Sequence, residues 1–389
     1  MKIEEYIDTY YPSVDGVVVT VDNYTKWLNA LGANCSVITA KTSSNPDNSS
    51  YKIYRFPSIP VVPKRGYTLS VPFLNQKLIQ EVESNKPDII HAHSPFSIGR
   101  LGLKIAKKNN IPIIATFHSK FYDDFYEATK SKILSKLLLK YTMNFFNKVD
   151  YVWTVNSSTA ATLKSYGYNG KIEIFSNGTD LSKPENADSL IQDTIKNFNM
   201  AGMDIFLFVG QHIWQKNLRL IFESLALYKK SNSNFKLIMV GTGNIIDELK
   251  VLAGTLNISD NIIFAGKILD RNILTGIYLT ADLFLFPSVY DNAPLVVREA
   301  AVCETPSLVI KDSGASERIV DMENGFLADE NAESVCNKIV QAMSDKERLK
   351  QISINASKTI PIPWKDVVDT VYKRYEEIVE ERKAKLVIN

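Results

Sequence analysis

The most informative stretch of this chain is Leu283-Phe-Leu-Phe-Pro-Ser-Val-Tyr-Asp-Asn-Ala-Pro-Leu-Val-Val-Arg-Glu299. Its first four residues form an apolar run that predicts a buried strand, and its last residues predict a helix. Asp291 falls in the loop that leaves the strand, and Glu299 falls inside the helix. In an open α/β sheet, ligands bind at the carboxyl ends of the strands. The two carboxylates are therefore expected to face one crevice and to suit a ligand rich in hydroxyl groups, unless the stretch is an acidic turn before an ordinary amphipathic helix.

Short β-branched runs alternate with longer helical patterns along the rest of the chain, which predicts parallel sheets in an α/β fold. In the N-terminal half, strands are expected at residues 2–7, 35–39, 89–91, 113–116, 151–155 and 172–175. In the C-terminal half, they are expected at residues 206–209, 236–240, 262–264, 283–286 and 307–310. Each half therefore suits a Rossmann-like, doubly wound domain, and the two domains are expected to face each other across a cleft.

The segment 181–202 breaks this rhythm, because it holds Pro184 and several Asn and Asp residues but no strong strand. We place the linker there, and we expect an N-terminal domain at 1–190 and a C-terminal domain at 196–365. The end of the chain reads as a charged amphipathic helix, and its part from about 370 to 389 is expected to pack back on the N-terminal domain.

Size and composition fit an ordinary globular protein. The chain has 389 residues, which is enough for two domains with a large core. Its net charge of +2 gives no electrostatic reason to bind nucleic acid. Three cysteines stand at scattered positions without a CxxC pair, which fits reduced thiols in the cytoplasm. No apolar stretch is long enough to span a bilayer, and two acidic residues among the first seven argue against a signal peptide.

Three motifs follow expected strands in the N-terminal half. Asp15-Gly16-Val17 precedes a helix expected at 18–31, where free N–H groups suit an anion, although the glycine could simply serve a turn. His91-Ala-His93-Ser94 carries two histidines that could suggest a metal, but no third ligand follows at zinc-like spacing and no acidic residue is expected near them. We therefore expect no metal site. His118 follows a third strand and is either structural or functional.

Two further motifs follow strands in the C-terminal half. Gly210-Gln211 begins a loop that ends near Lys216, just before a helix. A lysine in this position can neutralise a phosphate, although most lysines are simply solvated. Gly241-Thr-Gly243 follows the next strand and precedes a helix expected at 246–256; it resembles half of a dinucleotide fingerprint, which is weak evidence alone.

Taken together and in this order, the motifs resemble those of the retaining glycosyltransferases of family 4, which have the GT-B fold. The resemblance runs from Ile7 to about Tyr375. It is carried by Asp15-Gly16-Val17, Thr116-Phe-His118, Ser176-Asn-Gly-Thr-Asp180, Val209-Gly210 with Lys216, Val240-Gly-Thr-Gly243, Phe286-Pro-Ser288 and the acid pair Asp291 and Glu299. The chain departs from the family pattern at Asp291, where Glu is usual, at Gln211, where Arg commonly follows the glycine, and at Glu304, where Gly is usual.

The resemblance implies that a hexose is moved from a nucleoside-diphosphate sugar, with UDP-glucose as the first expectation, to an acceptor hydroxyl. It implies retention of the anomeric configuration, no metal ion and no cofactor. Lys216 would stabilise the leaving diphosphate, Asp291 would hold a hydroxyl of the donor sugar, Glu299 would hold the ribose, and His118 would lie beside the sugar. The other implied donor contacts are Gly16, Val17, Gly210, Gln211, Gly241, Gly243, Asn292, Ala293, Pro294 and Leu295. On the acceptor side, the implied residues are His93, Ser94, Phe121 and Tyr122.

The acceptor is expected to be a lipid or a glycan, since the family includes enzymes that glycosylate diacylglycerol at the inner leaflet. The segment Lys130–Phe146 pairs lysines with apolar residues at helical spacing, so it could lie on anionic lipid, or it could be a core-facing helix with a solvated basic rim. We expect a cytoplasmic protein that contacts the inner face of the membrane. A nucleotide-sugar epimerase of the same architecture and a non-catalytic nucleotide-sugar-binding partner remain alternatives.

Overall fold

The computed structural model describes residues 1–13, 15–42, 49–62 and 67–388. The chain divides into two compact units: unit 1 comprises Met1–Gly178 and Pro363–Asn389, and unit 2 comprises Thr179–Ile362. The chain thus leaves unit 1 before the expected linker, because the helix α7 (Ala187–Phe198) inside that segment packs on α10 (Arg271–Thr280) of unit 2. The first unit boundary therefore lies between residues 178 and 179, where limits at 190 and 196 were expected, and unit 2 ends at 362, where 365 was expected.

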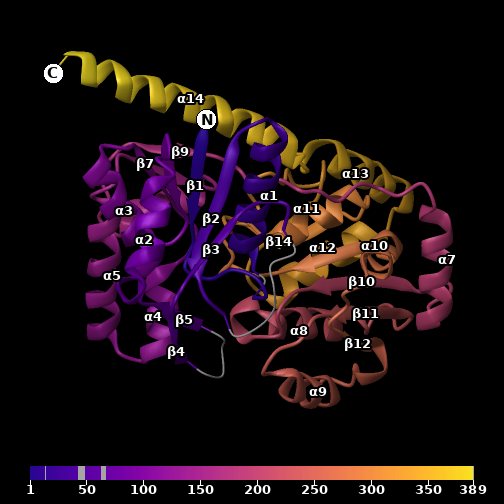
Figure 1. The fold of residues 1–389 in the computed structure, drawn as a ribbon. Coiled ribbons are helices and arrows are strands. Elements are labelled where there is room, and N and C mark those ends of the chain that lie inside the picture. The colour runs from indigo at the N-terminus through magenta and orange to yellow at the C-terminus, as the bar shows by residue number, and fades with distance from the viewer. Residues whose placement is uncertain (14, 43–48, 63–66, 389) are drawn as a thin grey trace. The chain divides into compact units, whose positions relative to one another are not determined.

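Unit 1 is built on a parallel sheet with the strand order β3-β2-β1-β6-β7-β8-β9 (Figure 1). Its strands are β1 (Lys2–Tyr6), β2 (Asn34–Ala40), β3 (Ile53–Phe56), β6 (Ile89–Ala92), β7 (Ile113–Phe117), β8 (Tyr151–Thr154) and β9 (Ile172–Ile174), and β4 (Ser58–Val62) pairs with β5 (Tyr67–Ser70) in a separate antiparallel hairpin. The winding reverses between β1 and β6, so the loops after these two strands border the position where a doubly wound sheet binds ligands.

The helices of unit 1 are α1 (Gly16–Ala30), α2 (Gln76–Ser84), α3 (Ser97–Asn109), α4 (Phe121–Thr129), α5 (Lys132–Phe146), α6 (Ser157–Ser165) and α14 (Trp364–Ile388), with the short 3₁₀ turn η1 (Pro72–Leu74). The C-terminal helix α14, yellow in Figure 1, packs beside α1. Arg374 ties α14 to the sheet, since its guanidinium donates two hydrogen bonds of 3.0 Å to the carboxylate of Glu173 in β9. This bidentate pair fixes the helix against the end of the sheet.

Unit 2 is built on a second parallel sheet, with the order β12-β11-β10-β13-β14-β15. Its strands are β10 (Asp204–Val209), β11 (Phe235–Val240), β12 (Ile262–Gly266), β13 (Leu283–Phe286), β14 (Ser307–Ile310) and β15 (Phe326–Ala328). Besides α7, its helices are α8 (Leu218–Tyr228), α9 (Ile246–Thr255), α10 (Arg271–Thr280), α11 (Leu295–Val302), α12 (Ala332–Met343) and α13 (Lys346–Thr359), with the 3₁₀ turns η2 (Trp214–Lys216) and η3 (Ser259–Asn261). Here the winding reverses between β10 and β13. Both sheets are parallel and doubly wound, which confirms the α/β prediction.

Local chemistry explains where these elements begin. All four residues of β13 are buried, as a continuous apolar run requires in a parallel sheet covered on both faces. The helix α1 starts two residues before the expected position, because Asp15 caps it: its Oδ1 accepts from the backbone N–H groups of Val17 and Val18 at 2.9 Å each. The strands β3, β4, β5 and β15 were not expected, since they are short and lack a long apolar run.

A close approach of two loops requires glycine at position 241. Gly241 follows β11 with a φ of +128°, and a Cβ placed there would lie 1.9 Å from the carbonyl oxygen of Gly210, which follows β10. A side chain at this position would force the two loops apart.

Within the part of the chain that the structure describes, we find no helix with both the length and the apolar character needed to cross a bilayer.

Candidate active site

Lys216 and Asp291 form an ion pair at the point where the sheet of unit 2 reverses its winding. Lys216 lies at the end of η2, in the loop after β10, and Asp291 lies in the loop after β13. Because β10 and β13 are hydrogen-bonded neighbours, their carboxyl ends bring these loops together. The Lys216 ammonium hydrogen-bonds Oδ1 of Asp291. Two residues that are 75 positions apart in sequence therefore form an ion pair at the carboxyl ends of the strands, which is where doubly wound sheets bind ligands.

Asp291 is held in place from its other side as well. The hydroxyl of Ser288 donates to Asp291 Oδ2 at 2.5 Å, so both carboxylate oxygens have a partner. The side chains of Lys216 and Asp291 are 14% and 18% exposed, so the pair is partly screened from water yet reachable. An ammonium group has three N–H donors, so the contact with Asp291 leaves Lys216 with capacity to bind an anion.

Glu299 has different partners from the Lys216–Asp291 pair. It lies on α11, and its Oε2 accepts a 3.1 Å hydrogen bond from the hydroxyl of Tyr278, which is fully buried in α10. Its Oε1 lies 3.7 Å from the guanidinium of Arg271, at the start of α10. Burial raises the pKa of Glu299 above its ordinary value, while Arg271 and Tyr278 act in the opposite direction. Tyr278 and Arg271 thus orient this carboxylate.

The remaining expected donor contacts of unit 2 lie at the ends of three neighbouring strands. Gly210 and the exposed Gln211 follow β10, and Gly241 and Gly243 follow β11. Asn292, Ala293, Pro294 and Leu295 lead into α11, where Pro294 stands just before the first helical residue. A Cβ at Gly314, in the loop after β14, would lie 2.2 Å from the carbonyl oxygen of Asn292, so Gly314 supports the loop of Asp291 from behind.

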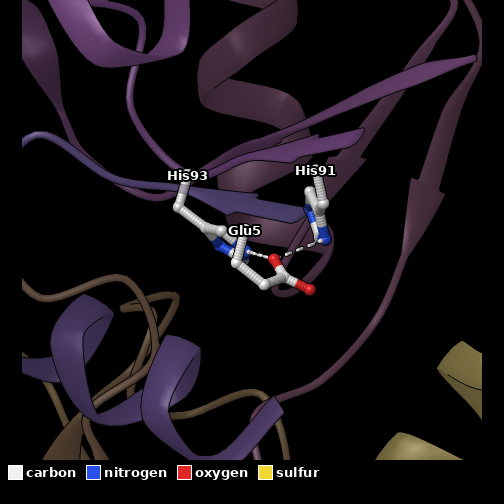
Figure 2. Close-up of side chains that lie close together, drawn as sticks. All are labelled: Glu5, His91 and His93. Atoms are coloured by element: carbon white, nitrogen blue, oxygen red, sulfur yellow. Dashed lines mark hydrogen bonds and ion pairs between the residues drawn. The ribbon is translucent and has the colours of Figure 1, made fainter. Parts of the chain in front are cut away.

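A network of buried polar side chains surrounds Glu5 in unit 1. Figure 2 shows the Glu5 carboxylate directed toward the imidazoles of His91 and His93. Glu5 Oε2 lies 2.7 Å from His93 Nε2 and 3.6 Å from His91 Nδ1. His91 Nδ1 also lies 2.5 Å from the hydroxyl of Tyr375 in α14, and His91 Nε2 lies 2.6 Å from the hydroxyl of Thr116 in β7. Strands β1, β6 and β7 and helix α14 therefore meet in one hydrogen-bonded cluster.

The presence of Glu5 corrects our expectation that no acidic residue lies near the histidine pair. Glu5 stands opposite His91 in the parallel pairing of β1 with β6, and this register is not visible in the local sequence. Glu5, His91 and His93 place their ligand-type atoms within 4.8 Å of one another. In a tetrahedral zinc site, however, bonds of about 2.0 Å separate ligand atoms by about 3.3 Å. The 2.7 Å between Glu5 and His93 is the length of a hydrogen bond. We therefore interpret the cluster as a hydrogen-bonded network.

Burial controls the charges in this network. It raises the pKa of Glu5 to about 8 and lowers the pKa of His93 to about 3. It also lowers the pKa of His91 and of His118 well below the ordinary range. The three imidazoles are therefore neutral at pH 7, and each carries one ring hydrogen.

The expected N-terminal site residues fall into different environments. His118 follows β7, and its Nε2 lies 3.0 Å from Nδ1 of His93, which links it to the network. Ser94 donates to Asp8 at 2.6 Å and accepts from the backbone N–H of Asp8 at 2.8 Å, so it organises the turn before α3. Phe121 is buried among Phe96, Phe117, Phe125 and Phe146 and packs in the core. Tyr122 lies beside Tyr166, and the backbone N–H of Tyr122 donates a hydrogen bond to the hydroxyl of Tyr166. Gly16 and Val17 form the first turn of α1, and apart from its chain neighbours and its own helix backbone, no described atom lies within 4 Å of a Cβ built at Gly16.

Two family sequence models match this chain. The one described as Glycosyltransferase Family 4 matches residues 14–183, and the one described as Glycosyl transferases group 1 matches residues 192–359. Together they span most of both units.

The chain is also similar to two alpha-monoglucosyldiacylglycerol synthases. It is 26% identical to the one from Acholeplasma laidlawii over 99% of this chain and 99% of that relative. It is 25% identical to the one from Streptococcus pneumoniae over 84% of this chain and 75% of that relative. Among solved structures, HepE from Anabaena in complex with UDP and glucose has a TM-score of 0.76 at 16% identity, covering 97% of this chain and 100% of that one. This likeness confirms the GT-B fold.

Proposed function

Because the chain belongs to the glycosyltransferases of family 4, we propose that it transfers a hexose from a nucleoside-diphosphate sugar to an acceptor hydroxyl. The proposed donor is UDP-glucose, the anomeric configuration is retained, and no metal ion takes part. The observation that carries this proposal is the Lys216–Asp291 ion pair at the winding reversal of unit 2.

The main physical problem of such a reaction is the departure of a nucleoside diphosphate. Negative charge develops on the leaving phosphate while the sugar becomes oxocarbenium-like. A fixed positive charge lowers this barrier if it is in place before the reaction begins. Asp291 and Ser288 hold the Lys216 ammonium in such a position. The sequence has no Asp-x-Asp motif of the kind that holds a metal in other glycosyltransferases, which supports Lys216 as the main cation.

We assign the other groups by their positions. The first turn of α11 directs backbone N–H groups toward the loop of Asp291, where they can bind phosphate oxygens. Glu299, oriented by Tyr278 and Arg271, accepts hydrogen bonds from the ribose hydroxyls. From the family resemblance alone, we also propose His118 as a contact of the donor sugar. Without a carboxylate assigned as a nucleophile, the acceptor attacks from the face that the diphosphate leaves, and the leaving phosphate takes the acceptor's proton.

Donor binding is expected to raise the thermal unfolding midpoint. A ligand at 100 times its Kd stabilises the folded protein by about 2.7 kcal/mol. In a panel of UDP-glucose, UDP-galactose, UDP-N-acetylglucosamine and GDP-mannose, we expect UDP-glucose to give the largest shift. A larger shift with another sugar nucleotide would reassign the donor, and no shift with any of them would contradict the proposed function.

We propose a diacylglycerol-type lipid as the acceptor, reached from the inner face of the membrane. The two synthases named above support this choice. The helix α5 supports it independently, because its outer face exposes Ile133, Leu137 and Tyr141 by 77%, 59% and 50%. Lys132, Lys136 and Lys140 are exposed on the same helix at a spacing of four residues. Apolar side chains flanked by lysines suit the boundary between acyl chains and anionic headgroups.

Reversing the charge of these three lysines is expected to release the protein from anionic membranes. Each lysine near such a surface contributes about 1 kcal/mol, so the variant Lys132→Glu/Lys136→Glu/Lys140→Glu should bind vesicles containing phosphatidylglycerol at least about 100-fold more weakly. Cosedimentation with vesicles measures the partition. The matched control replaces three exposed lysines of unit 2, Lys250, Lys267 and Lys350, by glutamate and should bind nearly as well as the unaltered protein. Equal losses in both variants would show a net-charge effect and contradict a membrane role for α5.

A further inference from the structure

We propose that Glu5 is a positioning residue that acts through His93 to determine which ring nitrogen of His118 carries the hydrogen. The importance of this device for sugar transfer depends on the proposed function, but the device itself can be tested in the ligand-free protein.

The proposal begins with an unbroken line of hydrogen bonds. Glu5 Oε2 lies 2.7 Å from His93 Nε2, and His93 Nδ1 lies 3.0 Å from His118 Nε2. A neutral imidazole has one N–H donor and one acceptor nitrogen, so His93 must donate at one of these contacts and accept at the other. The direction of the Glu5–His93 bond therefore fixes the direction of the His93–His118 bond.

When Glu5 is protonated, its carboxyl group donates to His93 Nε2. His93 then carries its hydrogen on Nδ1 and donates to His118 Nε2, and His118 carries its own hydrogen on Nδ1. When Glu5 is ionised, the carboxylate can only accept, so His93 carries its hydrogen on Nε2, accepts at Nδ1, and receives a hydrogen bond from His118 Nε2–H. The cluster loses one proton to solvent, and each imidazole keeps one hydrogen. The change converts His118 Nδ1 from a donor into an acceptor.

Among Glu5 and the groups around it, the Glu5 carboxyl is the one that changes its protonation near neutral pH. The groups that face Glu5 are Tyr24 from α1, Cys35 from β2, His91 and His93 from β6 and the loop after it, and Tyr375 from α14, whose hydroxyl donates to Glu5 Oε1 at 3.2 Å. Burial raises the pKa of Tyr24, Cys35 and Tyr375 and lowers that of both histidines. Of these groups, only Glu5, with a pKa raised by burial to about 8, changes charge between pH 6 and about 9.5.

The His93–His118 contact also restrains the ring as a whole. His93 is fully buried, and its ring lies nearly parallel to that of His118, with centroids 5.3 Å apart and an interplanar angle of 26°. A buried partner of this kind limits the orientations of a side chain at the end of a strand. Second-layer partners of functional histidines fix both the ring orientation and the tautomer in the same way.

The test is nitrogen-15 NMR of the ligand-free, full-length protein with labelled histidine, recorded from pH 6 to 9.5. The chain has only four histidines, and a His118→Asn variant assigns the signals of His118. In the unaltered protein, the hydrogen of His118 should move from Nδ1 to Nε2 as the pH rises, with a midpoint near 8. A single tautomer of His118 across this range would overturn the proposal, and this experiment requires no substitution at Glu5.

A pair of variants locates the effect. Glu5→Gln cannot titrate, so His118 should keep one tautomer at every pH. Glu4→Gln is the matched control: Glu4 is the neighbouring buried acid on β1, with a pKa raised by burial to about 7, but its partners are Tyr6 and Asn85. This control should show the same tautomer change as the unaltered protein. A change that persists in Glu5→Gln, or that disappears in Glu4→Gln, would assign the device to another group. If the unaltered protein showed the tautomer change but transferred no sugar in an assay, only the proposed function would be contradicted.

Discussion

Replacing Lys216 by alanine is expected to lower kcat about 100- to 1,000-fold, as removal of a single preorganised group that stabilises developing negative charge does in other enzymes. The structure gives the reason: Ser288 holds Asp291, and Asp291 holds the Lys216 ammonium at the carboxyl ends of the strands, where the diphosphate is proposed to lie. Release of nucleoside diphosphate in the presence of acceptor vesicles measures the rate. The circular dichroism spectrum and the unfolding midpoint should stay close to those of the unaltered protein.

The matched control for this variant is Lys250→Ala. Lys250 is an exposed lysine of the same unit, and it too pairs with an aspartate, Asp247, at 3.5 Å. Since an exposed pair of this kind contributes little to stability and lies on α9, its loss should leave kcat unchanged. A Lys216→Ala enzyme that turns over at the rate of Lys250→Ala would contradict our account of the leaving group.

Replacing Gly241 by alanine is expected to destabilise unit 2 by about 2–6 kcal/mol, because a strained backbone and an overpacked contact each cost about 1–3 kcal/mol. The added Cβ would meet the carbonyl oxygen of Gly210 at 1.9 Å, and the φ of +128° is one that alanine rarely adopts. Relief of this clash would also shift the loop that carries Lys216. The denaturant midpoint of the transition that reports unit 2 measures the effect.

The same substitution at Gly254 should have the opposite sign. Gly254 lies in α9, where no atom outside its own helix backbone comes closer than 3.9 Å to an added Cβ. Alanine is favoured over glycine in a helix by about 1 kcal/mol, so Gly254→Ala should raise the midpoint. If Gly241→Ala were as stable as the unaltered protein, the close packing of the loops after β10 and β11 would be wrong.

The elements that the sequence predicts best are those whose pattern is local. The run Leu283–Phe286 is apolar throughout, and it forms β13 with the expected limits. The short strand β15 and the hairpin of β4 and β5 were missed, because their pairing depends on partners elsewhere in the chain. The passage between the units was placed too late for a similar reason: α7 joins unit 2 through its packing on α10, which composition does not reveal.

In the candidate site too, the sequence predicts what is local and misses what depends on distant parts of the chain. Lys216 and Asp291 could each be placed at the carboxyl end of a strand, but their contact depends on β10 and β13 being neighbours, and sheet order is not encoded in any single motif. Glu5 was missed altogether, since the register of β1 against β6 brings it to histidines 86 and 88 residues away. Tyr278 and Arg271 were missed because they belong to none of the sequence motifs, and they reach Glu299 only through the packing of α10 on α11. Side chains that orient functional groups across the fold carry no local signal.

The most direct test of sugar transfer is proton NMR of the product formed from UDP-glucose and diacylglycerol-containing vesicles. The donor is α-linked, and our account predicts a new glucosyl lipid whose anomeric proton shows the small coupling of an α-glycoside, together with release of UDP. An isomerised donor without a glycoside would identify an epimerase, an unchanged donor would identify a binding protein, and a β-linked product would contradict retention.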